Sequence, residues 1–273
     1  MNTRRTTVRM FTRISILIIL ALLPCIVLAA EIKSVLIISI DSLHPDALGE
    51  ETTKTINEIM KKGVFTLNGS STAPPLTLLS HSAMFSGVGP DKGGLTENNW
   101  ESGQKQIDVK TIFDDAKRNH FFTGFFYSKE KLGYLISGAV DQCQLDQDFS
   151  VENAIEFFKE SNAKKFCFLH ISGLDRTGPV EGWMSDGYME ELFFIDESIR
   201  PLIDLVISRK DYLIIITSDH AGHEKTHGSE HQDDAKLPLV MTSDIAELTQ
   251  YQEMRYHVTQ LKNILINILD FRK

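Results

Sequence analysis

The stretch Ser34–Ile40 (SVLIISI), followed at once by Asp41, indicates the fold of this chain. An almost continuous apolar run of this length is typical of a strand that is buried on both faces, as in a parallel sheet. Four similar runs follow along the chain, at residues 121–127, 166–171, 212–217 and 237–241. Such runs predict the strands of one central sheet.

Segments with helical spacing of apolar residues lie between these runs, at residues 53–62, 107–118, 151–161, 185–208 and 258–269. Strands that alternate with helices predict an α/β fold, with a mostly parallel central sheet flanked by helices on both faces. The sequence contains no internal repeat and no linker. We therefore expect a single α/β domain over residues 31–273, without a large cap domain, because only residues 89–148 leave room for an insertion.

Composition excludes several classes of protein. The chain has 273 residues, with 28 Lys and Arg against 37 Asp and Glu, a formal net charge of −9 and three Cys. These values are ordinary for a globular protein and argue against intrinsic disorder or a disulfide scaffold. An acidic chain also lacks the basic face that nucleic-acid binding requires. We expect no nucleic-acid partner, and the oligomeric state stays open.

Residues 1–30 have the pattern of a secretory signal peptide. Four arginines precede an apolar run from Ile14 to Val27, and small residues follow at Ala29 and Ala30. The apolar run is shorter than the roughly 20 residues of a stable membrane span. We therefore expect export to the periplasm or the medium, with no membrane span after cleavage; an uncleaved anchor is the alternative. Cys167, inside an apolar run, is expected to be a buried thiol.

Chemically active side chains follow the ends of the predicted strands. Asp41 follows the first strand, Asp175 follows the run at 166–171, and Asp219-His220 follow the run at 212–217, with His227 seven residues further on. Ligands of parallel sheets gather at the carboxyl ends of the strands. A single Asp in such a place is usually a turn or cap residue. Several of them at one edge, mixed with His, favour a site for zinc or a similar divalent metal.

A second feature is the segment Pro74–Gly87 (PPLTLLSHSAMFSG). The prolines end an extended stretch, and residues 78–85 are then free to form a helix with Thr77 at its N-cap. Taken alone, Thr77 would be a helix cap. Beside a metal ion, its hydroxyl has the chemistry of a nucleophile for an anionic ester, with the helix N-terminus facing the charged oxygens.

Four segments resemble the alkaline phosphatase superfamily in their order along the chain. They are Ile40–Leu43 (IDSL), Pro75–Pro90, Asp175–Met184, and Ser218-Asp219-His220 with Thr226-His227-Gly228. The branch that they resemble most is that of the type I phosphodiesterases and nucleotide pyrophosphatases, with their sulfatase-like relatives. The Cys- or Ser-x-Pro-x-Arg pattern of the sulfatases is absent around Thr77, so we expect phosphate rather than sulfate chemistry.

The resemblance implies two zinc-type sites. Asp41, Thr77, Asp219 and His220 would form the first, with Thr77 as the nucleophile. Asp175, a histidine four residues later and His227 would form the second. Asn98 falls where this branch binds a phosphate oxygen with a side-chain amide; a turn asparagine is the alternative reading.

The sequence departs from the family pattern at one expected ligand. The family motif is Asp-x-x-Gly-His, but this chain has Pro179 in place of the histidine. Proline cannot bind a metal ion, so either one or two ions are expected. His170, Glu181, His223 and His231 are candidate substitutes that the sequence does not rank.

These features together predict an exported, metal-dependent hydrolase of phosphate esters, with diesters or nucleotide-like anhydrides as substrates. The expected partner is a small anionic phosphoester. The alternatives are a non-catalytic relative that binds an anion or a protein partner, as the loss at Pro179 suggests, and a phosphomonoesterase or mutase variant. Thr77, Asp219 and His220 are all retained, which favours catalysis.

Overall fold

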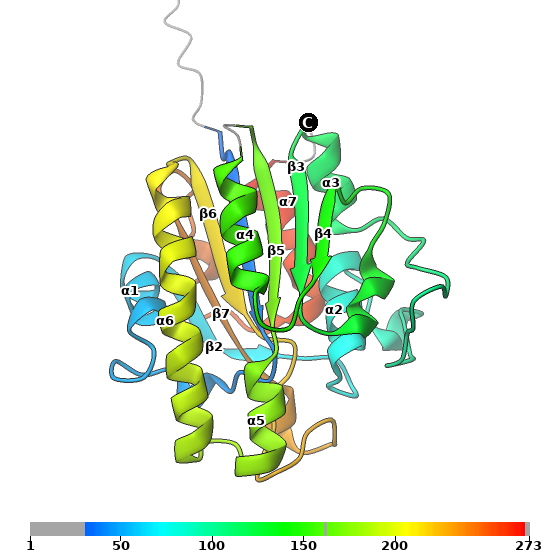
Figure 1. The fold of residues 1–273 in the computed structure, drawn as a ribbon, viewed down its shortest axis with the longest axis vertical. Helices are drawn as coiled ribbons and strands as arrows, with labels where there is room; N and C mark the ends of the chain where they lie inside the picture. The colour runs from blue at the N-terminus through cyan, green and yellow to red at the C-terminus, as the bar shows by residue number, and fades with distance from the viewer. Residues whose placement is uncertain (1–30, 161–162, 271–273) are drawn as a thin grey trace, which may run out of the picture. The chain divides into compact units, whose positions relative to one another are not determined.

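The computed structural model describes residues 31–160 and 163–270. Within them the strands form one eight-stranded sheet in the order β4-β3-β5-β1-β6-β7-β2-β8 (Figure 1). The strands are β1 (Ser34–Ile40), β2 (Val64–Ser70), β3 (Phe122–Tyr127), β4 (Gln142–Leu145), β5 (Lys165–Ile171), β6 (Tyr212–Thr217), β7 (Lys236–Ser243) and β8 (Tyr256–His257). All neighbouring strands pair in parallel except for β7, which is antiparallel to both β6 and β2.

Helices cover both faces of this sheet. They are α1 (Lys54–Lys62), α2 (Thr77–Ser86), α3 (Ile112–Arg118), α4 (Ser150–Lys159), α5 (Gly173–Glu181), α6 (Asp186–Ser208) and α7 (Leu261–Ile268). One apolar core packs α2, α3 and α7 on one face, and a second core packs α1, α4 and α6 on the other. In Figure 1, α4 and α6 lie in front of the sheet and α7 lies behind it. The expected α/β class is confirmed.

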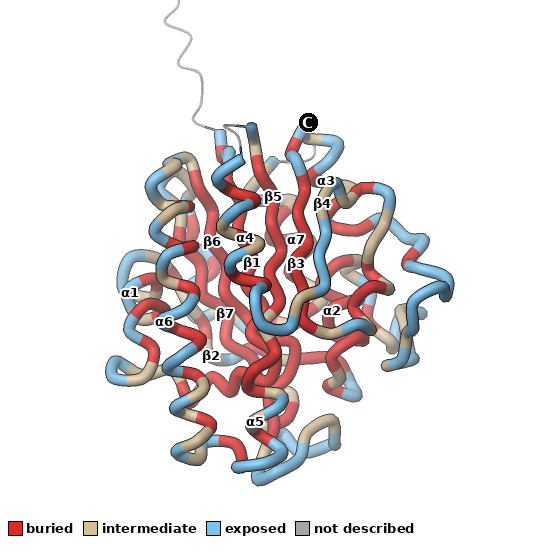
Figure 2. The backbone as a smooth tube through the Cα atoms, viewed as in Figure 1, coloured by how far each residue is buried: buried red, intermediate tan, exposed pale blue. Residues whose placement is uncertain are grey.

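The central strand β1 explains why Ser34–Ile40 predicts the fold so well. Every residue of β1 is buried, because the strand lies between β5 and β6 and both of its faces are covered (Figure 2). Its side chains alternate between the two cores, with Ile37 in one and Leu36 in the other. A strand buried on both faces must be apolar throughout, and this is the pattern in the sequence.

Several elements differ from the expectations. The helix expected over residues 107–118 begins only at Ile112, because the Thr111 side chain accepts a hydrogen bond from the backbone N–H of Phe113 and forms a capping box with Asp114. The helix expected over residues 258–269 starts as a 3-10 turn and becomes α7 at Leu261. Strands β2, β4 and β8 were not expected, since each is short or alternates polar and apolar residues.

The segment 89–148 contributes to the sheet itself. It contains β3, β4 and α3, with irregular chain before α3, and forms no separate cap domain. The described residues from Glu31 onward cluster as one unit. The predicted signal peptide lies outside the described residues. Among the residues that are described, no helix is both long and apolar enough to cross a membrane. Cys167 is buried in β5 as a free thiol, as expected, and Cys143 is free and exposed.

Helix α1 is capped by a side chain from another helix. The Thr53 side chain at its N-cap makes no capping hydrogen bond. Instead, the buried Asp196 of α6 accepts hydrogen bonds from the backbone N–H of Thr55 at 2.8 Å and from that of Ile56 at 3.0 Å. This carboxylate satisfies two of the backbone donors that every helix start leaves unpaired.

We expect Asp196→Ala to lower the free energy of unfolding by about 1–3 kcal/mol, because it leaves buried N–H groups without acceptors. The measurement is chemical denaturation of the folded chain. Asp204→Ala is the matched control, because Asp204 is an exposed carboxylate on the same helix. Equal stability of the two variants would contradict this role of Asp196.

Candidate metal centre and active site

The carboxyl ends of β1 and β6 bring three predicted site residues together. These strands are parallel neighbours in register, with Ser39 beside Thr217, so Asp41 and Asp219-His220 leave the sheet at the same edge. On the other side, the backbone N–H of Asp41 donates to the carbonyl oxygen of Ile171 at the end of β5, 2.8 Å away. The position of the site thus follows from strand register.

Asp41, Asp219 and His220 form a buried group with the composition of a metal site. One ligand atom from each lies within 4.8 Å of the others. His220 Nε2 is 3.4 Å from Asp41 Oδ1 and 3.6 Å from Asp219 Oδ2. Because His220 Nδ1 lies 2.9 Å from the carbonyl oxygen of Ala221, we assign the ring proton to Nδ1. The lone pair on Nε2 is then free for a metal, which is the usual arrangement of a histidine ligand.

The buried Asp219 provides the test of whether these residues fit a cation. Its Oδ2 atom is buried and has no hydrogen-bond donor, although a buried charged oxygen without a partner is costly. Burial, together with the negative charge of Asp41, raises the pKa of Asp219 to about 6. A divalent cation would satisfy this oxygen. Two carboxylates and an imidazole suit zinc or a similar ion, so the residues fit the group that the sequence predicts.

Thr77 is the first residue of α2 and lies beside this group. The N-cap residue is Leu76, so the expectation that Thr77 is the N-cap is wrong. The hydroxyl of Thr77 is therefore not used for capping: its Oγ1 lies 3.4 Å from His220 Nε2 and 3.1 Å from Lys129 Nζ. This geometry leaves the hydroxyl available for chemistry at the positive end of a helix.

Asn98 performs the capping that Thr77 does not. Its Oδ1 accepts a hydrogen bond of 3.0 Å from the backbone N–H of Leu78, in the first turn of α2. The asparagine predicted to bind substrate thus contacts the residue that follows Thr77 in the chain. Its carbonyl oxygen is engaged with the protein, and its role toward a phosphate oxygen stays a prediction.

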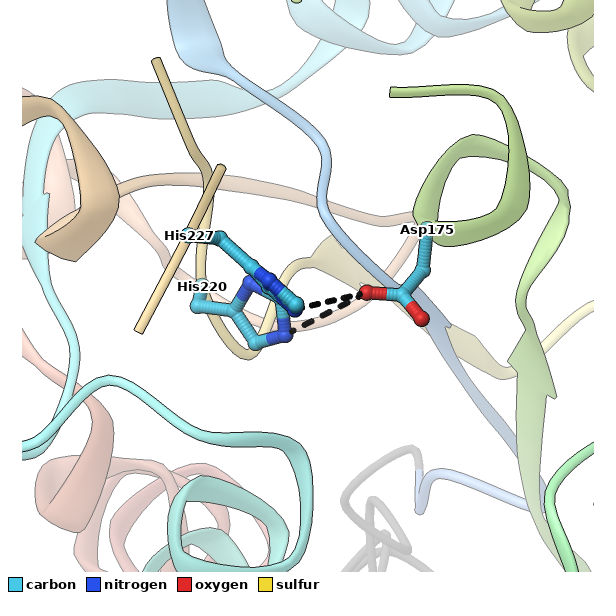
Figure 3. A group of neighbouring side chains, drawn as sticks. All are labelled: Asp175, His220 and His227. Carbon is cyan, nitrogen blue, oxygen red and sulfur yellow. Dashed lines mark ion pairs between the residues drawn. The ribbon is translucent and has the colours of Figure 1, made fainter. Parts of the chain in front are cut away.

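A second group consists of Asp175, His220 and His227 (Figure 3). Asp175 lies in α5, which continues from β5 beyond the carboxyl edge of the sheet. Its Oδ1 atom is 3.2 Å from His227 Nε2 and 3.8 Å from His220 Nε2, and it also accepts a hydrogen bond of 3.0 Å from Ser42 Oγ. All the predicted ligands therefore gather in one place, with His220 shared between the two groups.

Trp183 forms the wall behind His227. The two rings stack with centroids 5.6 Å apart and an angle of 30° between their planes, and the indole N–H donates to the carbonyl oxygen of Ser42 at 3.3 Å. Gly178 and Gly222 both contact the indole, where an added Cβ would lie only 2.8 and 2.4 Å from its ring atoms. Glycine is therefore required at both positions for the indole to fit.

None of the candidate substitutes takes the place of the missing ligand. Pro179 lies in α5 one turn after Asp175, where a histidine would share its helical face. His170 Nε2 is 3.0 Å from Asp41 Oδ2, on the other side of the site. Glu181 is exposed at the end of α5.

His223 and His231 stack on each other in a separate group with Asp234, whose Oδ1 is 2.6 Å from His223 Nδ1.

Sequence reasoning missed the residue at the middle of the site, Lys129. Its Nζ is 2.6 Å from Asp41 Oδ2 and 2.6 Å from Asp175 Oδ2. Burial would lower the pKa of Lys129, but these carboxylates raise it above its usual value, so the ammonium stays charged. Lys129 follows β3 by two residues. The strand-end rule, applied to the run at residues 121–127, would have found it.

Two buried histidines, His170 and His81, support the site from behind. Sequence reasoning named His170 only as a candidate substitute ligand and assigned His81 no role. His170 receives a hydrogen bond from the backbone N–H of Ser128 on Nδ1 and faces Asp41 with Nε2. Burial by itself raises the pKa of Asp41, but Lys129 and His170 hold it well below its usual value. His81 of α2 lies 2.7 Å from the carbonyl oxygen of Thr77 through Nδ1. Its burial, together with the charge of His170, lowers its pKa far below the usual value, so this imidazole is neutral.

A sequence model described as type I phosphodiesterase / nucleotide pyrophosphatase matches residues 35–236, well over half of the chain. The chain belongs to this family. The matched region contains every residue predicted for the site, namely Asp41, Thr77, Asn98, Asp175, Asp219, His220 and His227. The resemblance to the alkaline phosphatase superfamily is thereby confirmed.

Individual relatives of this phosphodiesterase-family chain are distant. GPI ethanolamine phosphate transferase 1 of Yarrowia lipolytica is 24% identical in an alignment 196 residues long, which covers 59% of this chain and 20% of that protein. The chain therefore spans about a fifth of the length of this curated relative.

Solved structures share the fold. A 2-O GAG sulfatase superposes with a TM-score of 0.70 at 14% identity, covering 88% of this chain and 71% of that chain. The C-terminal periplasmic domain of EcEptC from Escherichia coli, in a complex with Zn, superposes with a TM-score of 0.66 at 11% identity, covering 88% and 82%. At such identities these structures support the alkaline-phosphatase-like fold alone.

We expect zinc at about 100 times its dissociation constant to raise the free energy of unfolding by about 2.7 kcal/mol, because the ion binds only the folded chain. Thermal unfolding with zinc and with a chelator measures this difference. Asp219→Asn should abolish it. The comparison is made in a His231→Ala background, which removes the separate group around Asp234. Equal stabilisation with and without Asp219→Asn would contradict a metal site at Asp219.

The same zinc stabilisation should decrease as the pH falls through about 6. Asp219 has a pKa raised to about 6, so its carboxylate binds a proton below that value and competes with the cation. The measurement is the zinc-dependent change in Tm at pH 7.5 and at pH 5. A change in Tm that is independent of pH would show that Asp219 does not hold the ion.

Proposed function

We propose that this chain is a metal-dependent enzyme that cleaves phosphate esters with Thr77 as its nucleophile. The observation that carries the proposal is the position of the Thr77 hydroxyl at the start of α2, 3.1 Å from Lys129 Nζ and 3.4 Å from His220 Nε2. Membership of the phosphodiesterase family supports phosphate esters, and diesters or nucleotide-like anhydrides in particular.

In the proposed reaction Thr77 Oγ1 attacks the phosphorus atom. The bond between Thr77 Oγ1 and phosphorus forms as the hydroxyl releases its proton to solvent, and the bond between phosphorus and the leaving oxygen breaks, with that oxygen taking up a proton from solvent to leave as an alcohol. Water then attacks the phosphothreonine, which releases the phosphate product and restores the hydroxyl. An ion held by Asp41, Asp219 and His220 would supply the positive charge that lowers the pKa of the hydroxyl and stabilises charged oxygens.

The residues around Thr77 suit an anionic substrate. Lys129 places a positive charge beside the hydroxyl, and Thr77 is the first residue of α2, at the positive end of the helix dipole. Asn98 fixes the start of the helix through Leu78 and so positions Thr77. With a net charge of −9, the chain would repel long polyanions, so we propose a small anionic phosphoester as the substrate and no nucleic acid.

A zinc-type ion, one or two per chain, is part of this proposal, and so is export. The oxygen and imidazole donors support zinc, and one structural neighbour is a Zn complex. Export rests on the signal-like residues 1–30, and the same neighbour is a periplasmic domain. Elemental analysis of the purified chain tests the identity and number of the bound ions, and fractionation of cells tests export.

Purified chain with zinc should hydrolyse a nitrophenyl phosphodiester, and Thr77→Ala should lower kcat/KM by about a thousandfold or more, because the nucleophile is lost. Thr77→Ser, which keeps a hydroxyl, should retain part of the activity. Release of nitrophenol measures the rate. If wild type and Thr77→Ala are equally inert while zinc still binds, the chain is the non-catalytic binding protein that the loss at Pro179 suggested.

Transfer to an alcohol is a second candidate, favoured by the relative named as an ethanolamine phosphate transferase. The phosphothreonine would then be attacked by an acceptor hydroxyl in place of water. The same assay distinguishes the two, because an added primary alcohol would yield a new phosphate ester at the expense of the hydrolysed product. An unchanged product ratio favours hydrolysis.

A further inference from the structure

We propose that the ammonium group of Lys129 serves as the second cation of this site, so that the chain works with a single divalent ion at Asp41, Asp219 and His220. The inference rests on the proposed function and concerns how its charge is supplied. Where the resemblance implies two metal ions, this chain would use one ion and one lysine.

The contacts of Lys129 are those of a built-in cation. A lysine ammonium has three N–H donors, and Lys129 Nζ has three acceptors: Asp41 Oδ2 at 2.6 Å, Asp175 Oδ2 at 2.6 Å and Thr77 Oγ1 at 3.1 Å. Its side chain is only 17% exposed. A lysine that merely neutralised surface charge would keep its ammonium in water.

The backbone that carries Lys129 is also fixed. The preceding residue, Ser128, donates from its backbone N–H to His170 Nδ1 at 3.3 Å, and its hydroxyl donates to Ser172 Oγ at 2.9 Å. Both partners belong to the end of β5 and the turn after it. The lysine therefore leaves the sheet from a hydrogen-bonded position next to the strand that leads to Asp175.

The carboxylates of the two proposed metal sites differ in whether the protein supplies them with hydrogen-bond donors or cations. Asp219 Oδ2 is buried without a donor, and this is the atom that a metal ion would satisfy. Asp175, by contrast, has Lys129 on Oδ2, and His227 and Ser42 on Oδ1. The carboxylate that the family pattern assigns to the second ion already has a partner on each of its two oxygens.

Pro179 and the charge count lead to the same conclusion. The second site lacks a histidine at position 179, and the histidine that joins Asp175 and His227 is His220, whose Nε2 the first ion would already use. The site has three carboxylates, of Asp41, Asp175 and Asp219, and one ammonium, which leaves two negative charges. One divalent cation neutralises them, and a second would leave the site with excess positive charge before substrate binds.

The test counts the zinc ions that depend on Asp175, which separates this site from the group around Asp234. Equilibrium dialysis of the full chain against zinc alone, with elemental analysis, gives the number of ions bound. We expect Asp175→Asn to leave that number unchanged, and Asp219→Asn to lower it by one. Loss of an ion on Asp175→Asn would overturn the proposal, because the second site would then be a metal site despite Lys129.

A restored ligand makes the test sharper. Pro179→His alone should add no ion, since Lys129 still fills the position. Lys129→Ala together with Pro179→His should add one ion, which is lost again when Asp175→Asn is included. Lys131→Ala with Pro179→His is the matched control and should add none, because Lys131 lies in the 3-10 helix Glu130–Leu135, directly after Lys129, but forms no ion pair with these carboxylates.

A gain of an ion with Pro179→His alone, or no gain in the Lys129→Ala double variant that still binds the Asp219-dependent ion, would contradict the proposal. Circular dichroism confirms that each variant is folded, and the comparison of wild type with Asp175→Asn stands without any change at Lys129. Because these results are ion counts, they are independent of turnover. An inactive chain with one Asp219-dependent ion would refute the proposed function and leave the role of Lys129 standing.

Discussion

The burial of carboxylates at one edge of the sheet is the constraint on which the rest of the site depends. Asp41 and Asp219 are fully buried, and Asp175 is partly buried beside them. Ionised carboxylates in such surroundings are unfavourable unless positive charge and hydrogen-bond donors accompany them. The positions of Lys129 and His170 follow from this requirement, because Lys129 brings a positive charge and His170 an N–H donor to Asp41.

Much of this arrangement follows from sequence because parallel strands end together. The apolar runs identified β1, β3, β5, β6 and β7, and the residues directly after β1 and β6 were placed at one edge by that rule alone. Strand β2 was missed because buried and partly exposed residues alternate along it and several of them are polar. Strand β4 was missed because it lies at the edge of the sheet and most of its residues are exposed. Local hydrophobicity carries no signal for such strands.

The site itself was less predictable where long-range contacts decide it. Thr77 was expected to cap its helix, but the acceptor that does so, Asn98, lies in a loop 20 residues after its donor, Leu78. Lys129 was missed for a related reason: a lysine after a strand is ordinarily exposed, and only the folded chain brings Asp41 and Asp175 to both sides of it. The sequence therefore indicates which carboxylates and histidines form the site. It does not indicate which side chains contact them, because those contacts form only in the folded chain.

The close packing of Trp183 restricts which substitutions this chain can accept around it. The indole lies against Gly178 in α5 and Gly222 in the loop after β6, and it also stacks on His227. A larger residue at either glycine displaces the ring, and a smaller ring at position 183 leaves a void that a side chain at either glycine would fill. These three positions should therefore change together or not at all, and a substitution tolerated at one of them reports on the other two.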